Sequence, residues 1–115
     1  RLAEAFGSRP RDILAAIGPG ISVCCFETHQ DVPDGLRAHM GAAADPYIHP
    51  IPSTEKYHVD LKGLNRAWLL QAGVPSEHIA VCSACTACDL TSFWSHRRQG
   101  PARGSMAALI QISKE

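Results

Sequence analysis

The segment DLKGLNRAWLLQAGVPSEHIAV, residues 60–81, decides the fold because it contains the most clearly defined helix of the chain and the strand that follows it. Its apolar residues recur at three- and four-residue steps on one helical face, which comprises Leu61, Leu64, Trp68 and Ala72. Asp60 is a good N-cap residue, whereas Gly73 and Pro75 predict the end of the helix. The apolar run 79–81 then predicts a short strand.

The residues before this segment predict a further helix end and a further strand. Residues 1–7 have the composition of the last turns of a helix that ends at Gly7. The continuous apolar run 13–17 predicts a buried strand, which the Gly-Pro-Gly triplet 18–20 interrupts. Because Arg1 already lies inside a helical pattern, we expect the chain to be part of a longer protein.

The remaining patterns complete an α+β fold. Residues 31–40 carry apolar side chains at helical spacing, and residues 41–52 are rich in Ala, Gly and Pro and predict a surface connection. Residues 56–60 alternate as in a strand, and residues 106–112 predict another, last strand of the main sheet. Helices and strands alternate without a regular βαβ repeat, so we expect a mixed β-sheet packed with helices.

The composition limits the possible partners. The chain has 115 residues, enough for one small domain, and its 11 basic and 11 acidic residues give a formal net charge of zero. Proteins that bind nucleic acids or membrane surfaces usually carry a strong basic excess, so neither partner is expected. Five cysteines are an odd number, which fits reduced thiols and a cytoplasmic location better than a secreted disulfide framework.

Three of the cysteines stand at regular intervals in Cys82-x-x-Cys85-x-x-Cys88. A structural zinc site needs four ligands, so the fourth would have to be Cys24, Cys25 or a histidine from elsewhere. Thiols packed beneath a loop are the simpler interpretation, and we assign no metal ligand from the spacing. For the adjacent pair Cys24-Cys25, packing is likewise favoured over reactivity.

The segment that follows carries two adjacent arginines, Arg97 and Arg98, behind the aromatic pair Phe93-Trp94. Guanidinium groups can bind a phosphate or a carboxylate through paired hydrogen bonds, while aromatic rings provide an apolar wall. Paired arginines are more often a solvated face of a protein. The glycines and proline at positions 100, 101 and 104 favour a shaped loop and hence a contact with a ligand.

Three ordered blocks of the sequence resemble the laccase-domain family, also called YfiH-like or multicopper polyphenol oxidase, in which many members are assigned as purine nucleoside phosphorylases. The first block comprises AIGPGI at 16–21 and CCFE at 24–27. The second comprises HVDL at 58–61, Asn65, Leu70 and the Gly-Val pair 73–74. The third comprises CTACD at 85–89, Phe93, Ser95, Arg97, Arg98 and GSMAA at 104–108.

The resemblance implies a YfiH-like fold of which residues 1–115 are the C-terminal portion of a single domain. Members carry their catalytic His, Cys and His in motifs that do not occur here, so these metal ligands are expected upstream of Arg1. Departures from the pattern include His96, where tyrosine is common, and Ser105, where arginine is frequent. Cys82 lies outside the usual cysteine pair.

The implied activity is a zinc-dependent, copper-tolerant phosphorolysis of adenosine, inosine, guanosine or methylthioadenosine, with adenosine deamination as a second activity. The implied partners are a purine nucleoside and phosphate, together with the N-terminal half of the same protein or further copies in a homo-oligomer. Arg97 and Arg98 are the candidates for phosphate binding. Candidates for lining or bracing the pocket are Cys25, Asp60, Cys85 and Cys88, with Asp60 assigned first to capping.

Two alternatives remain open. A copper-dependent polyphenol oxidase needs many histidines at paired spacing, which six scattered histidines do not supply. The second alternative is a small cysteine-rich metal-binding module without catalytic activity.

Overall fold

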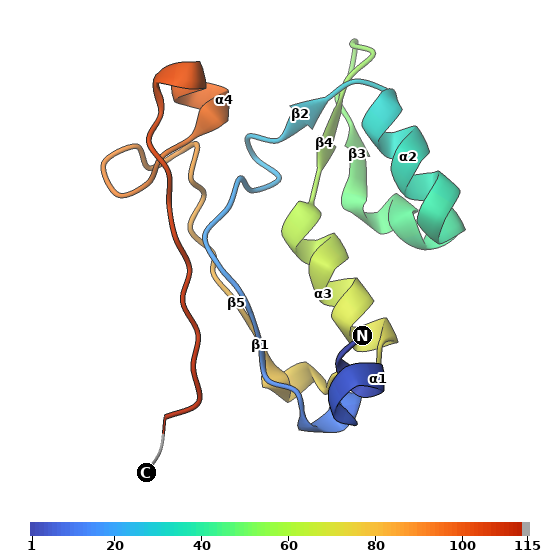
Figure 1. The fold of residues 1–115 in the computed structure, drawn as a ribbon. Helices are drawn as coiled ribbons and strands as arrows, with labels where there is room; N and C mark the ends of the chain where they lie inside the picture. Colours follow the sequence, from blue (N-terminus) through green and yellow to red (C-terminus); the bar gives the residue numbers. More distant parts are fainter. Residues whose placement is uncertain (114–115) are drawn as a thin grey trace.

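The computed structural model describes residues 1–113 as an α+β arrangement around one long helix (Figure 1). The helices are α1 (Leu2–Phe6), α2 (Asp31–Met40), α3 (Leu61–Gln71) and α4 (His96–Gln99). The strands are β1 (Ala15–Ile17), β2 (Glu27–Thr28), β3 (Ile48–Pro50), β4 (Tyr57–Val59) and β5 (Ile79–Val81). Short 3₁₀ helices are η1 (Pro10–Asp12), η2 (Gly41–Tyr47), η3 (Ser76–His78) and η4 (Gly100–Ala102).

Helix α3 begins and ends where the sequence predicts. The Asp60 side chain accepts a hydrogen bond of 3.0 Å from the backbone N–H of Gly63, which satisfies one of the free donors of the first turn. At the other end, Gly73 has a φ of +92°, a conformation that glycine adopts without strain. Val74 then donates to the carbonyl of Leu69 at 3.0 Å and is itself buried. Both caps are therefore confirmed.

The predicted apolar face of α3 is only partly buried. Leu64 is 2% exposed, whereas Trp68 is 44% exposed and Ala72 is also exposed. Of the four residues on this face, only Leu64 is therefore part of the core. Helix α3 contacts η2 and the strands β1 and β5.

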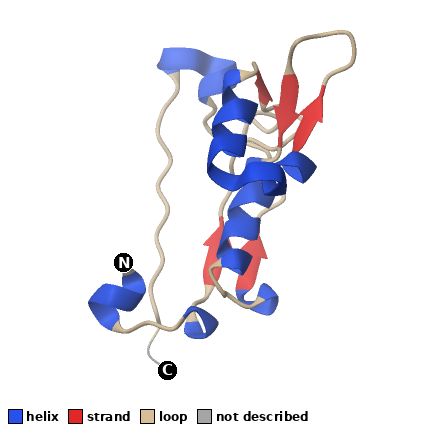
Figure 2. Ribbon diagram, turned by 90° about the vertical axis from the view of Figure 1, so that its right-hand side faces the viewer, coloured by secondary structure: helices blue, strands red, loops and turns tan. Residues whose placement is uncertain are grey.

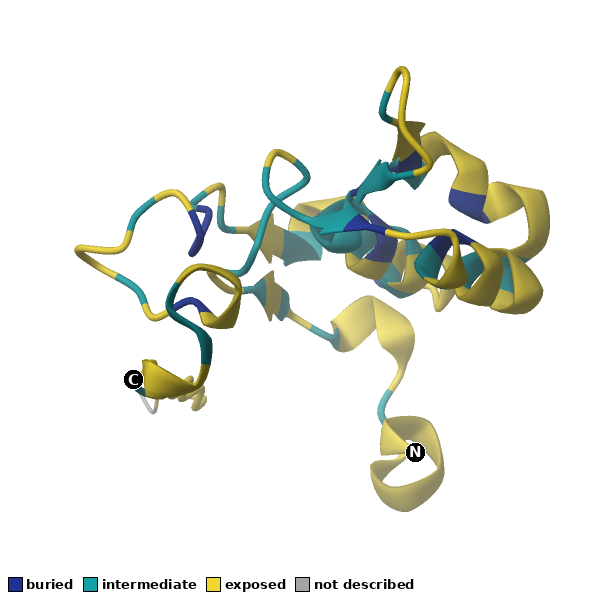
Figure 3. Cartoon of the chain, turned by 90° about the horizontal axis from the view of Figure 1, so that it is seen from above, coloured by how far each residue is buried: buried dark blue, intermediate teal, exposed yellow. Residues whose placement is uncertain are grey.

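The core lies between α3, η2 and an antiparallel sheet with the strand order β2-β4-β3. Ile48 on β3 pairs with Val59 on β4, and both side chains are buried against the helical layer. Ala44 in η2 and Leu64 in α3 are buried as well. Figure 3 shows that buried segments make up only a small part of the chain. Most of the predicted surface connection 41–52 is exposed, but the stretch also forms η2 and β3 and contributes Ala44 and Ile48 to the core.

A second sheet consists of the parallel strands β1 and β5, with Ala15 opposite Ile79 and Ile17 opposite Val81. Figure 2 shows the two sheets near opposite ends of α3. Both predicted strands are confirmed, but the buried environment expected for residues 13–17 is wrong, since Leu14 is 73% exposed. The α+β class is confirmed; parallel and antiparallel pairing both occur, divided between two sheets.

The predicted last strand, residues 106–112, is not a strand in this structure. The segment is extended but unpaired, and its side chains are open to solvent, with Leu109 fully exposed and Ile112 98% exposed (Figure 1). Strand formation needs a neighbouring strand, and the described residues place none beside it. Accordingly, the radius of gyration of 16.4 Å exceeds the ~13 Å expected for a compact domain of this length.

Within residues 1–113, no helix is long and apolar enough to cross a membrane.

Candidate functional site

Two loops, one after β1 and one after β5, are brought together at the carboxyl ends of these parallel strands. The backbone N–H of Cys82 donates to the carbonyl of Ile17 at 2.8 Å, and that of Thr86 donates to the carbonyl of Gly20 at 3.2 Å. Gly20 and Cys85 also form an isolated parallel bridge. The parallel pairing therefore continues past the strands as far as Gly20 and Cys85, and it holds the two loops side by side.

This alignment collects four sulfur atoms, which we call the four-cysteine cluster. Its members are Cys24, Cys25, Cys85 and Cys88, whose sulfur atoms all lie within 4.8 Å of one another. The Sγ atom of Cys88 lies 3.4 Å from that of Cys25 and 3.7 Å from that of Cys24. All four thiols are free. The structure thus adds Cys24 and Cys25 to the pair Cys85 and Cys88 of the third block. Cys82 is not a member of the cluster.

The electrostatic environment differs from one thiol to the next. Burial opposes the ionisation of Cys85, but the backbone N–H groups of Ser22, Ala87 and Cys88 outweigh this effect and lower its pKa to about 6. The Ser22 N–H lies 3.3 Å from the Cys85 sulfur. The opposite shift occurs at Cys88, where hydrogen bonding among the neighbouring sulfurs, first with Cys25, raises the pKa to about 12.

The loop after Cys88 is held by Asp89. Its carboxylate accepts hydrogen bonds from the hydroxyl of Thr91 at 2.6 Å and from the N–H of Ser92 at 3.1 Å. These donors, the Thr91 hydroxyl first, lower the pKa of Asp89 to about 2. The carboxylate therefore stabilises the turn that follows the cluster.

The two predicted phosphate-binding arginines point to different surroundings. Arg97 donates to the carbonyl of Glu27 at 2.7 Å, and its guanidinium carbon lies 5.4 Å from the centre of the Phe26 ring. Arg98 donates to the carbonyl of Ala87 at 3.1 Å and places another nitrogen 3.9 Å from the sulfur of Cys25. Arg98 therefore faces the four-cysteine cluster.

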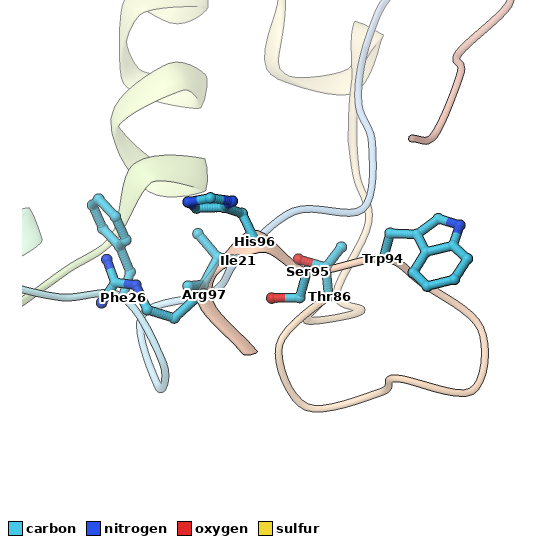
Figure 4. A pocket seen from close by; sticks show the side chains of 7 residues that line it. All are labelled: Ile21, Phe26, Thr86, Trp94, Ser95, His96 and Arg97. Atoms are coloured by element: carbon cyan, nitrogen blue, oxygen red, sulfur yellow. The ribbon is translucent and has the colours of Figure 1, made fainter. Parts of the chain in front are cut away.

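A pocket of about 290 Å³ lies next to the cluster (Figure 4). Its lining comprises Ile21, Phe26, Thr86, Trp94, Ser95, His96 and Arg97. The close-up shows the Arg97 guanidinium beside the Phe26 ring at one end and Trp94 at the other, with Ser95 and Thr86 between them. The pocket thus combines aromatic walls with hydroxyl groups and one permanent positive charge.

The remaining predicted pocket residues have other positions. Asp60 caps α3 as described above, which confirms its first assignment. Cys25, Cys85 and Cys88 belong to the four-cysteine cluster. Sequence reasoning missed Lys62, whose ammonium group reaches from α3 to the carbonyls of Cys82 at 2.9 Å and Ala84 at 2.7 Å. A lysine in the first turn of a helix gives no signal of such a role.

Replacing Lys62 by methionine is expected to loosen the cysteine loop, because the change keeps the side-chain length but removes the charge and the donors. Two partly buried carbonyls would lose their hydrogen bonds, at a cost of about 1–3 kcal/mol. Amide hydrogen exchange at Cys85 and Thr86 should accelerate accordingly. Arg66→Met on the same helix removes a contact to Ser76 and should leave this exchange unchanged.

The sequence of residues 1–113 matches the family described as "Multi-copper polyphenol oxidoreductase laccase". The chain belongs to this family. The YfiH-like fold is confirmed by a solved structure, that of YlmD from Geobacillus stearothermophilus, with a TM-score of 0.75 and 40% identity over 84% of this chain and 36% of that one. The YfiH protein of Bacillus licheniformis superimposes with a TM-score of 0.77 and 38% identity over 86% of this chain and 38% of its own.

Relatives in this laccase family bear the names of enzymes acting on nucleosides. "Purine nucleoside phosphorylase YlmD" of Geobacillus stearothermophilus is 43% identical over 92% of this chain and 38% of its own length. "Adenosine deaminase RL5", from an unknown prokaryotic organism, is 40% identical over 76% of this chain and 33% of its own length. The chain thus spans about two fifths or less of these relatives.

Proposed function

We propose that residues 1–115 are the C-terminal portion of a single laccase-family domain in an enzyme that cleaves purine nucleosides with phosphate. The observation that carries the proposal is the 43% identity to a purine nucleoside phosphorylase over 92% of the chain. Adenosine, inosine, guanosine and methylthioadenosine are the proposed substrates, and adenosine deamination is the proposed second activity. We also propose that the protein is cytoplasmic.

Phosphorolysis needs an anion site next to the sugar carbon that phosphate attacks. Arg97 lines the pocket and is permanently charged, so it can hold the phosphate through charge-assisted hydrogen bonds. The guanidinium lies over the Phe26 ring, and the Glu27 carbonyl accepts a hydrogen bond from one of its nitrogens. Arg98, which faces the four-cysteine cluster, adds positive potential behind the pocket rather than a direct contact.

The catalytic metal of this proposal is zinc, with copper as the tolerated substitute. Among residues 1–113, the four-cysteine cluster is the one group of three or more metal-ligating side chains, so a His-Cys-His set is not present there. We therefore expect its ligands in the preceding part of the protein. That part would also cover the apolar surface of β1, β5 and residues 106–112, and a homo-oligomer would bring further copies into contact.

The test is phosphate-dependent nucleoside cleavage by the complete protein and by its Arg97→Ala variant. Loss of charge-assisted hydrogen bonds worth about 1.5–3 kcal/mol should raise the KM for phosphate by roughly 10- to 150-fold. The KM for the nucleoside should change far less. Adenosine deamination consumes no phosphate, so its rate should be preserved in the same variant, which also shows that the variant is folded.

Two further variants sharpen the test. Arg97→Lys retains the charge and should recover part of the phosphate affinity, whereas Arg66→Ala on α3 removes a distant arginine and should have no effect. An unchanged KM for phosphate in Arg97→Ala would exclude the phosphate-binding role of this residue. Absence of phosphate-dependent cleavage in the unmodified complete protein would exclude the proposed activity itself.

A further inference from the structure

The four-cysteine cluster has the dimensions of a tetrahedral metal site. A zinc ion bound to four thiolates at about 2.3 Å places the sulfur atoms about 3.8 Å apart. The sulfur distances in the cluster are 3.4 Å, 3.7 Å and 3.8 Å for the three contacting pairs, and none of the six exceeds 4.8 Å. These values match the edges of such a tetrahedron and are far longer than a disulfide bond of about 2.05 Å.

The surroundings of the cluster suit a bound cation with thiolate ligands. A zinc ion with four thiolates carries a net charge of −2, which hydrogen-bond donors around the sulfurs can offset. The Ser22 N–H donates to the Cys85 sulfur at 3.3 Å, and the Arg98 guanidinium lies 3.9 Å from the Cys25 sulfur. Cys24 and Cys88 are exposed, so a metal ion can reach the site from solvent.

We propose that the four-cysteine cluster is a structural zinc site that binds one Zn²⁺ through four thiolates. Tetrahedral sulfur coordination is typical of zinc or iron. An iron–sulfur cluster divides its four cysteines among two or four irons and so separates cysteine sulfurs on different irons by the width of the cluster. The four sulfurs here all lie within 4.8 Å of one another, which is too close for such a cluster. Since all four coordination positions are filled by protein, the site is closed and holds structure rather than substrate.

The proposed ion joins the two loops that carry the pocket. Cys24 and Cys25 lie in the loop after β1, directly before Phe26, whereas Cys85 and Cys88 flank Thr86 in the loop after β5. Without the ion, the two loops are joined beyond the strands by backbone hydrogen bonds at Cys82 and Thr86 and by the Ser22 N–H bond to the Cys85 sulfur. The zinc site would fix the positions of Phe26 and Thr86, which both line the pocket, relative to each other. This inference stands on the geometry of the sulfurs and does not depend on the proposed nucleoside chemistry.

The first experiment uses the unmodified complete protein, purified under reducing conditions without chelator. Zinc and iron are quantified, and alkylation of each cysteine is followed by mass spectrometry before and after treatment with a strong chelator. We expect Cys24 and Cys88 to resist alkylation until the metal is removed, although both are exposed. Rapid alkylation of both in a zinc-containing protein would overturn the proposal without any variant.

The second experiment compares Cys88→Ser and Cys24→Ser with Cys82→Ser as the matched control. Cys82 shares the three-residue spacing with Cys85 but lies outside the cluster, so its replacement should leave the metal content unchanged. Each cluster variant should lose one equivalent of zinc per chain relative to the unmodified protein, whatever zinc is bound elsewhere. Cobalt(II) substitution should give the intense thiolate-to-metal absorption of four sulfur ligands, which the cluster variants lose.

Three further outcomes would overturn the proposal. Equal zinc content in the unmodified protein and both cluster variants would show that the cluster binds no zinc. Iron in place of zinc at the same sulfurs would refute the assignment of the metal. A disulfide within the cluster in freshly reduced, metal-replete protein would indicate a redox-active pair of thiols and not a metal site. The test does not use nucleoside cleavage as a readout. The zinc site can therefore be refuted without refuting the proposed activity, and the activity without refuting the zinc site.

Discussion

Replacing Leu64 by alanine is expected to lower the free energy of unfolding by about 2–5 kcal/mol, the range for truncating a fully buried leucine. Leu64 is 2% exposed and is among the largest fully buried side chains of the chain. It lies on α3, which contacts η2 as well as the strands β1 and β5. A cavity at this position therefore weakens the packing of a helix that contacts elements of both sheets' surroundings, namely η2, β1 and β5.

Leu70→Ala is the matched control for this prediction. The same side chain is removed from the same helix, but Leu70 is 37% exposed and contributes less buried surface. Its loss should cost well under half as much, since alanine is also the better helix former. Urea unfolding of the complete protein gives both values, and a Leu64 variant as stable as the Leu70 variant would show that the core is centred elsewhere.

The parts of the fold that the sequence predicts correctly are those with local causes. Helix α3 is bounded by Asp60 and Gly73, and both act through contacts within a few residues. The errors at β1 and at residues 106–112 concern burial and pairing, which depend on what lies beside a segment. An alternating apolar pattern indicates that one face of a strand is suited to burial, but it does not identify the element that packs against this face.

The candidate site shows the same division. The sequence identifies the conspicuous residues, namely the cysteines and the paired arginines, but their grouping is a property of the parallel pairing of β1 with β5. That pairing aligns Cys24 with Cys88 although they are 64 positions apart. The regular three-residue spacing is misleading in this respect, because it includes Cys82 and omits the adjacent pair. Likewise, Arg97 and Arg98 are neighbours in the chain yet contact different groups.

Gly63 illustrates a further requirement that no periodicity reveals, namely space for a neighbouring ring. A Cβ atom at this position would lie 2.8 Å from two carbons of the Tyr47 ring and would also meet the Asp60 carboxylate. Both neighbours matter, since Tyr47 ends η2 and its carbonyl accepts a hydrogen bond of 2.9 Å from the N–H of Asp60. The missing side chain of Gly63 allows η2 to approach the start of α3 closely.

Gly63→Ala is therefore expected to destabilise the protein, although alanine is intrinsically better than glycine in a helix by about 0.5–1 kcal/mol. Displacing the Tyr47 ring costs about 1–3 kcal/mol by overpacking. Disturbing the Asp60 cap costs a further ~0.5–2 kcal/mol. The unfavourable contributions exceed the gain in helix propensity, so we expect a net loss of about 1–3 kcal/mol in urea unfolding of the complete protein.

Gly35→Ala provides the control with the opposite sign. Gly35 lies inside α2, where an added Cβ has open space around it, so only the gain in helix propensity remains. This variant should be more stable by about 0.5–1 kcal/mol. The same substitution in two helices of one chain thus separates propensity from packing. If both variants gain stability, the close approach of Tyr47 to α3 is not a constraint, and the start of α3 must be able to move away from η2.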